Sequence, residues 1–334
     1  MRSFLAYLAQ RVVQFVFVVF AGVTLAFAIA HLSPVDPVEQ SLTLLTNVGA
    51  SDPKSVSLLR DALSQLYGVN GSMFEQYVGF WRRVLSFDFG PSLSAFPTPV
   101  MQIILRAMPW TAGLLISSTL LAWLLGNLLG ALAGYYRNNR LLKTAGIVVM
   151  AVQPIPTYIL GLALLILFGF LWPVLPISGG AEINLPPGLT GAFLLSLLQH
   201  AILPTATLTL VNIGGWFVSM RSLVSNIVTE DHVVYAELAG VPSRTIFSMY
   251  VARNAMLPQV TGLALRLGHM FGGAVIVEFL FAYPGMGQLL ISGITAGDYS
   301  LVLGVTTISI VAVALSVFFI DLLYPLIDPR VKLA

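Results

Sequence analysis

The chain has 334 residues, of which 57% are hydrophobic and only 9% are charged, whereas about 25% of the residues in a soluble domain are charged. Its formal net charge of +2 and its dispersed Lys and Arg residues exclude an extended nucleic-acid-binding surface. The absence of cysteine excludes disulfides, thiolate metal sites and cysteine nucleophiles. Most of the chain must therefore lie against lipid or against other buried helices.

Charge-free stretches separate the ionisable residues, and each is long enough to hold the ~20 apolar residues that cross a bilayer. They cover residues 12–35, 107–136, 144–181, 183–220 and 299–320. A sixth segment, residues 259–281, has only Arg266, His269 and Glu278 as ionisable residues. The sequence therefore predicts an all-α membrane protein with about six transmembrane helices.

The basic residues predict how these spans are oriented. They precede the first span, lie between the second and third, and follow the last: Arg2, Arg11, Arg137, Arg140, Lys143, Arg330 and Lys332. Residues 173–199 and 284–299 contain no Lys or Arg, so the positive-inside rule places both termini in the cytoplasm. The apolar run at residues 12–30 exceeds the length of a signal-peptide core, so we expect it to be retained as a membrane helix.

A polar external region follows the first span. Residues 33–37, Ser-Pro-Val-Asp-Pro, end the helix as it leaves the membrane. Two sets of apolar residues then recur at helical spacing: Val56, Leu59, Leu63 and Leu66, and Phe74, Tyr77, Phe80, Trp81 and Leu85. They predict two amphipathic helices. We therefore divide the chain into residues 1–100, the first helix with this external region, and residues 101–334, the transmembrane domain.

The third predicted span contains Pro154 and Pro156. Proline inside a membrane helix frees backbone carbonyls, so we expect a kink there. The sequence shows no inverted repeat of three-helix halves, which disfavours the commonest plans of secondary transporters.

The largest cytoplasmic segment that the orientation predicts lies between the fourth and fifth spans. Asp231 is a candidate cap for a helix that ends at Gly240, and Ser243 for a second helix that runs toward Asn254. The pattern predicts a helix, a tight turn and a helix. An exposed, rigid element of this kind can dock into a groove on another protein and transmit its motion, although an ordinary helical hairpin has the same spacing.

Residues 235–240, Tyr-Ala-Glu-Leu-Ala-Gly, and residues 253–258, Arg-Asn-Ala-Met-Leu-Pro, resemble the coupling loop, or EAA motif, of a known family. This family comprises the membrane subunits of binding-protein-dependent ABC importers, in their dipeptide, oligopeptide and nickel branch. The resemblance extends over nearly the whole chain. It includes residues 32–34, 36–37, 88–90, 92, 108–111, 272–274, 278, 283–287, 297–299, 321–324 and 328–330.

The resemblance implies the type I ABC importer transmembrane fold, with a cytoplasmic coupling loop at about residues 229–254. The loop residues that it implies for coupling to an ATPase are Tyr235, Ala236, Glu237, Ala239, Gly240, Pro242 and Arg244. It also implies a bacterial inner membrane, two ATPase subunits, a second related permease and an extracytoplasmic substrate-binding protein. No glycine is followed by lysine, so the chain lacks a phosphate loop. ATP and magnesium are therefore expected on partner chains, with no cofactor on this one.

Polar residues inside the spans are candidates for the translocation path or gate. A guanidinium at mid-bilayer costs at least ~2.5 kcal/mol, so Arg266 must face a partner or an aqueous cavity. His269 lies on the same helical face, and Glu278 lies near the outer end of this span. Trp216 follows two glycines that allow close helix approach. A structural tie for Arg266 and a packing role for Trp216 remain open alternatives.

The sequence predicts no catalytic or metal site. The four histidines are scattered without ligand spacing, and no nucleophile elbow or paired histidine and carboxylate motif appears. We therefore expect a permease, not an enzyme, that moves peptides or similar small oligomeric solutes by alternating access. The alternatives are the same machinery importing oligosaccharides or nickel chelates, and a secondary transporter or channel that works alone.

Overall fold

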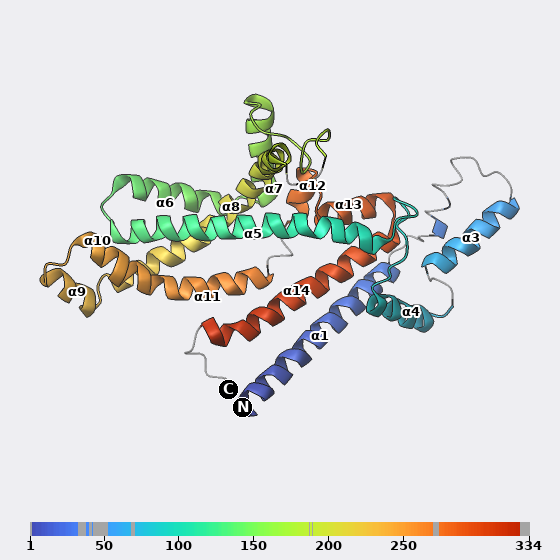
Figure 1. The fold of residues 1–334 in the computed structure, drawn as a ribbon, viewed down its shortest axis with the longest axis horizontal. Helices are drawn as coiled ribbons and strands as arrows, with labels where there is room; N and C mark the ends of the chain where they lie inside the picture. Colours follow the sequence, from blue (N-terminus) through green and yellow to red (C-terminus); the bar gives the residue numbers. More distant parts are fainter. Residues whose placement is uncertain are drawn as a thin grey trace. The chain divides into compact units, whose positions relative to one another are not determined.

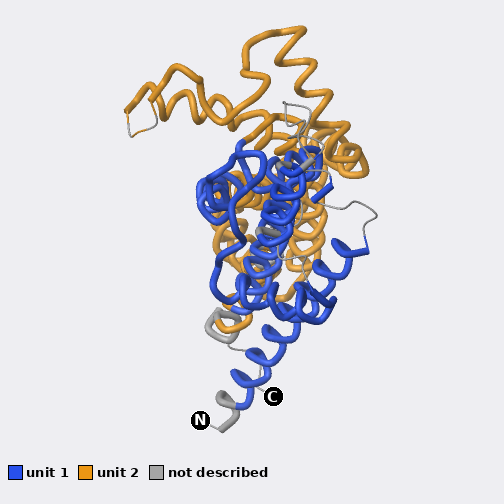
Figure 2. The backbone as a smooth tube through the Cα atoms, turned by 90° about the vertical axis from the view of Figure 1, so that its right-hand side faces the viewer, with its two compact units in different colours: residues 1–111, 284–318 blue, residues 112–283, 319–334 orange. Residues whose placement is uncertain are grey.

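A computed structural model describes residues 2–32, 38–39, 42, 53–67, 71–186, 188, 190–269 and 274–327. The chain forms two compact units, residues 1–111 with 284–318 and residues 112–283 with 319–334 (Figure 2). The described residues form helices, with no β-strand beyond one isolated bridge (Figure 1). The division predicted at residue 100 stays a prediction, because these units group residues by contact and not by chain order.

The elements, in chain order, are α1 (Arg2–Leu32), α3 (Pro53–Tyr67), α4 (Met73–Ser86), α5 (Val100–Tyr135), α6 (Arg140–Val152), α7 (Thr157–Leu165), the π-helix η1 (Ile166–Leu171), α8 (Gly191–Ile227), α9 (Asp231–Leu238), α10 (Ser243–Thr245), the π-helix η2 (Ile246–Ala252), α11 (Arg253–His269), α12 (Val275–Leu280), α13 (Met286–Ala296) and α14 (Tyr299–Ile327). Among the described residues, α1, α5, α8 and α14 are long and apolar enough to cross a membrane. A bent pair, α6 with α7 and η1, brings the number to five if it is one span. The sixth predicted span, residues 259–281, falls on α11 and α12. Residues 270–273, between these two helices, lie outside the described residues.

The predicted kink in the third span is confirmed, and it is sharp. α6 ends at Val152, α7 begins at Thr157, and the helix direction changes by 110° between them. Pro156 occupies the cap position of α7 without a side-chain hydrogen bond. Because neither Pro154 nor Pro156 has a backbone N–H to donate, the α-helical ladder cannot continue through this break.

In the first unit, α3 and α4 confirm the two predicted amphipathic helices. On α4, Phe80 and Val84 are buried in a cluster with Val23 and Phe27 of α1, and the Tyr77 hydroxyl is hydrogen-bonded to a threonine of α1 at 2.7 Å. The middle of the predicted apolar stripe therefore fastens α4 to α1, whereas Phe74 and Leu85 at its two ends are 74% and 75% exposed.

A buried carboxylate joins two distant segments of the first unit. Asp298 is fully buried and accepts hydrogen bonds from the Ser92 hydroxyl and from the Ser94 backbone N–H and hydroxyl, the latter two at 3.0 and 2.9 Å. Its other oxygen accepts from the Leu301 N–H at 3.1 Å. This network satisfies the buried charge and ties the loop before α5 to the corner between α13 and α14.

The start of α4 has a reciprocal cap that makes its stability depend on pH. The Ser72 hydroxyl accepts from the Glu75 N–H, and the Glu75 carboxylate accepts from the Ser72 N–H at 2.7 Å. The backbone bond from Ser72, followed by the bond from its hydroxyl, lowers the pKa of Glu75 from its usual 4.5. Because the pKa is lower in the folded state, the carboxylate stabilises the fold above its unfolded pKa, and this contribution disappears as pH falls through the folded pKa.

Glu75→Gln keeps the shape of this cap and removes its charge. We expect the parent to unfold at a higher temperature than the variant near pH 7, with the difference shrinking as pH falls below 4.5. Unfolding temperatures of the two detergent-solubilised proteins across this range provide the measurement. A difference that stayed constant with pH would contradict the account.

In the second unit, α5 and α8 touch through their backbones. A Cβ atom added to Gly126 would lie 2.8 Å from the carbonyl oxygen of Ile213, and one added to Gly130 would lie 2.6 Å from that of Phe217. At Gly134 the corresponding distance to a carbonyl oxygen of α8 is 2.9 Å. Glycine at every fourth position therefore places three hydrogen atoms where side chains would keep the helices apart.

Candidate functional site: a docking element and a membrane cavity

The segment between α8 and α11 forms the predicted helix, turn and helix, and a Schellman turn closes the first helix. Gly240 has φ +75°, its N–H donates to the Glu237 carbonyl at 3.0 Å, and the Val241 N–H donates to the Ala236 carbonyl at 3.1 Å. This pair of bonds requires a left-handed residue after the helix, a conformation that glycine adopts without steric cost. The tight turn predicted at Gly240 is confirmed.

The two predicted capping residues are each displaced by one position. Glu230 is the cap residue of α9, without a side-chain cap bond, and Asp231 is the first helical residue. Pro242 precedes α10, likewise without a side-chain cap bond, and Ser243 begins that helix. Both predictions were therefore wrong in detail. Asp231 still lies in the first turn, where a negative charge favours the helix dipole.

The inner face of α9 is packed against the rest of the second unit. Val233 and Ala236 are buried in a cluster with Val224 of α8 and with Ile246 and Val251 of η2. Hydrogen bonds support this packing: the Tyr135 hydroxyl donates to the carbonyl of the first α10 residue at 3.2 Å. The packing predicts that α9 and α10, which we call the docking element, move as one body with the ends of α5 and α8 (Figure 1).

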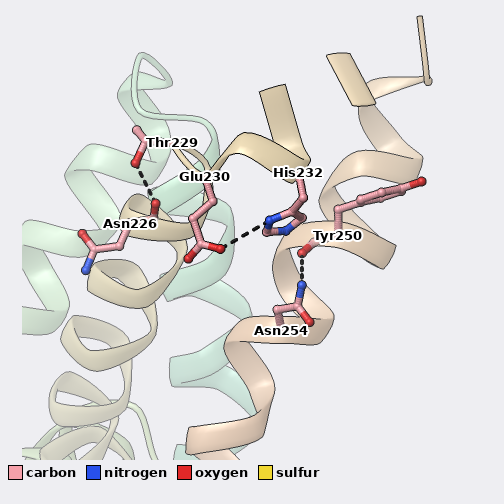
Figure 3. A network of polar contacts seen from close by, with 6 residues as sticks. All are labelled: Asn226, Thr229, Glu230, His232, Tyr250 and Asn254. Carbon is pink, nitrogen blue, oxygen red and sulfur yellow. Dashed lines mark hydrogen bonds and ion pairs between the residues drawn. The ribbon is translucent and has the colours of Figure 1, made fainter. Parts of the chain in front are cut away.

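Polar contacts secure the start of α9 (Figure 3). The Thr229 hydroxyl donates to the carbonyl of Asn226 at 2.7 Å. Nδ1 of His232 lies 3.3 Å from the Glu230 carboxylate, which gives an ion pair when the histidine is protonated. These contacts fasten the short connection between α8 and the docking element.

The outer face of the docking element exposes large apolar side chains. Tyr235 is 69% exposed and Leu238 is 79% exposed. Of the residues that the family resemblance implied for coupling, Ala236 is buried, whereas the others are exposed: Tyr235, Glu237, Ala239, Gly240, Pro242 and Arg244. Exposed apolar side chains on a segment with a buried opposite face are typical of a protein-binding surface.

The second helix of the docking element, α10, continues through η2 into α11 without a break in the helix. α10, η2 and α11 follow one another, and the junction residues Ile246 and Arg253 have right-handed helical backbone angles. At the last junction, the Asn254 side chain donates to the Tyr250 carbonyl at 2.7 Å (Figure 3). Arg266 thus lies on the same helical rod as α10, about 35 Å from Ser243 at 1.5 Å per residue.

A cavity of about 450 Å³ lies between α5, α7, α8 and α11. Its lining residues are Leu115, Ser118, Thr119, Thr157, Leu208, Val211, Asn212, Trp216, Leu265 and Arg266. The Arg266 guanidinium carbon lies 4.7 Å from the centre of the Trp216 ring, a cation–π contact worth about 0.5–2 kcal/mol. A Cβ atom on Gly215 would lie 3.1 Å from Nη2 of Arg266, so this glycine leaves space for the guanidinium.

The structure thus brings together two of the four predicted path residues, Arg266 and Trp216. Glu278 is fully buried on α12 and is not among the residues that line this cavity. His269 ends α11, but its side chain lies outside the described residues. Among the described residues we find no group of three metal-ligating side chains.

The sequence analysis did not single out the neutral polar residues of the cavity. These are Ser118 and Thr119 on α5, Thr157 on α7 and Asn212 on α8. A signal was present, because each is a polar residue within a predicted apolar span. Their convergence depends on the packing of helices that are far apart in sequence.

Comparison with known proteins shows where the chain belongs. Residues 126–333 match the family described as binding-protein-dependent transport system inner membrane component. The probable D,D-dipeptide transport system permease protein DdpB of Escherichia coli (strain K12) is 32% identical, with 98% of each chain covered. The oligopeptide transport system permease protein AppB of Bacillus subtilis (strain 168) is 27% identical, over 98% of this chain and 99% of its own. The dipeptide transport system permease protein DppB of Escherichia coli (strain K12) is 27% identical, over 94% and 95%.

The matched region contains the docking element, the cavity residues of α7, α8 and α11, and the close contact of α8 with α5. The relatives are transport permease proteins, and the apolar helices of this chain suit a multi-pass membrane subunit. Its all-α structure is the type I importer transmembrane fold. The chain belongs to the family of binding-protein-dependent transport system inner membrane components.

Proposed function

We propose that this chain is a permease subunit of an ATP-driven importer that moves peptides across the bacterial inner membrane by alternating access. The observation that carries the proposal is similarity to permease proteins whose names state dipeptide or oligopeptide transport. The similarity covers at least 94% of this chain and of each of these relatives. It therefore includes the segments that would shape the path as well as the coupling segment.

In this proposal the energy comes from partner chains. The exposed Tyr235 and Leu238 on a firmly packed α9 supply a surface for an ATPase, and ATP and magnesium bind to that partner. The assembly has two ATPase subunits, a second related permease and an extracytoplasmic binding protein. Both termini lie in the cytoplasm, on the same side as the docking element, as the distribution of Arg and Lys favours.

The cavity at Trp216 and Arg266 is our candidate for part of the translocation path. It combines apolar walls with a few polar groups, as small-molecule sites do, and a cavity explains how a guanidinium can reside at membrane depth. His269 and Glu278 remain candidates for the path or its gate. The continuous helix from Ser243 to His269 supplies a mechanical link between the docking element and this cavity.

Uptake by reconstituted vesicles tests the function. The chain, co-expressed with its permease and ATPase partners, is placed in vesicles with ATP on the docking-element side, and the binding protein with a labelled dipeptide on the other side. We expect the dipeptide to accumulate only with hydrolysable ATP. A labelled oligosaccharide of similar size serves as the comparison and should not accumulate.

Two outcomes would overturn this assignment. Accumulation of the oligosaccharide without accumulation of the peptide would support the alternative solute class. Uptake that proceeds equally without ATP would indicate a secondary transporter or a channel. The side of the membrane on which the termini lie is tested separately by labelling single introduced cysteines. Only the introduced thiol can react, because the natural chain has no cysteine.

A further inference from the structure

One side chain supplies the charge in the membrane cavity. Arg266 is the only charged residue among the described residues that line it. The remaining polar groups are neutral: three hydroxyls and the amide of Asn212. The Arg266 side chain is exposed, so an anion that enters the cavity can reach its guanidinium.

The guanidinium is oriented but not neutralised by the described residues. Trp216 covers one face of it at 4.7 Å, and the bare backbone at Gly215 lies beside Nη2. Among the described residues, Arg266 forms no ion pair and its N–H groups find no hydrogen-bond acceptor. Its planar donor fork is therefore available for a two-oxygen anion such as a carboxylate.

Trp216 supplies an independent indication of a missing partner. Its side chain is only 5% exposed, and its indole Nε1–H is buried without an acceptor among the described residues. Buried polar groups are normally hydrogen-bonded, and an unsatisfied one requires an explanation such as water or a ligand. An occupant with oxygen atoms beside Arg266 can provide that acceptor.

We propose that this cavity binds the C-terminal carboxylate of a peptide in transit, with Arg266 as the residue that recognises it. The inference rests on the proposed function, because it assumes that a peptide enters the cavity. Asn212 and the hydroxyls of Ser118, Thr119 and Thr157 are suited to the neutral peptide groups that precede the carboxylate in the peptide. The cavity volume of about 450 Å³ is within the range of small-molecule sites.

Protection of an introduced thiol tests this without the binding protein or transport. Val211→Cys places a thiol in the cavity wall while leaving every polar lining group intact. In the purified complex in nanodiscs, we expect Ala-Ala to slow its labelling at least about fivefold, and Ala-Ala-amide to have little effect. Adding Arg266→Gln should abolish the protection, because the amide side chain lacks the charge and the planar fork.

Further variants make the test decisive. Gly215→Ala adds a Cβ that would lie 3.1 Å from Nη2 of Arg266, and it should reduce protection by Ala-Ala even if Arg266→Gln fails to assemble. Equal protection by Ala-Ala and its amide, no protection by either, or protection that survives Arg266→Gln would overturn the proposal. Protection by Ala-Glu-amide would show that side-chain carboxylates suffice, and would overturn the assignment to the peptide terminus. Failure of ATP-driven uptake with thiol protection intact would instead count against the proposed function.

Discussion

Gly130→Ala is expected to destabilise the chain by about 1–3 kcal/mol, the usual cost of an overpacked interior. This destabilisation is expected even though helices intrinsically favour alanine over glycine. The added Cβ would lie 2.6 Å from the carbonyl oxygen of Phe217 and 3.0 Å from Cβ of Met220. Neither atom can rotate away, so α5 and α8 must separate. The unfolding temperature of the detergent-solubilised protein should therefore fall by several degrees.

Gly113 is the matched control for this prediction. It lies on the same helix, and a Cβ there would meet no atom within 4 Å. Gly113→Ala should leave the unfolding temperature unchanged or raise it slightly, since alanine gains about 0.5–1 kcal/mol over glycine in a helix. If Gly130→Ala stabilised the chain as Gly113→Ala does, the close contact between α5 and α8 would be wrong.

Sequence alone predicted the features that depend on short-range chemistry. The charge-free stretches identified α1, α5, α8 and α14, because a bilayer requires a minimum apolar length. The break near Pro154 and Pro156 follows from their missing N–H groups, and the conformation of Gly240 follows from its missing side chain. Each of these features is determined within a few residues.

Features that depend on distant contacts could not be derived in this way. The tie between Ser92 and Asp298 spans 206 residues, and nothing in either segment specifies the partner. The cavity lining gathers Thr157, Asn212 and Arg266 from three helices. Helical periodicity tells which residues share one face, but not which other helix that face meets.

The displaced caps at α9 and α10 show a different limit. Asp231 and Ser243 are residue types that favour a helix start, yet each begins its helix one position after the cap. Helix boundaries depend on small differences between neighbouring positions, and buried Val233 and Ile246 add packing constraints to the local preferences. The prediction of two helices around a tight turn was confirmed, whereas the predicted cap residue of each helix was wrong by one position.

Gly240→Val is expected to uncouple this permease from its ATPase partners. The turn needs φ +75°, and a β-branched residue is a steric outlier in that region. The cost of a left-handed conformation, about 1–2 kcal/mol for an ordinary residue, corresponds to about a tenfold loss of the docking conformation. No atom lies within 4 Å of a Cβ added to Gly240. The substitution therefore acts through the backbone conformation and not through a steric clash within the chain.

Gly240→Asn separates this backbone effect from an effect of side-chain volume. Asparagine resembles valine in size but adopts the left-handed conformation more readily. The most direct test of coupling is therefore peptide-stimulated ATP hydrolysis by the reconstituted complex with binding protein, for the parent and both variants. We predict at least about a tenfold loss for Gly240→Val and near-parental stimulation for Gly240→Asn. Parental stimulation in Gly240→Val, with the complex fully assembled, would contradict the claim that this turn transmits motion between the ATPase and the membrane helices.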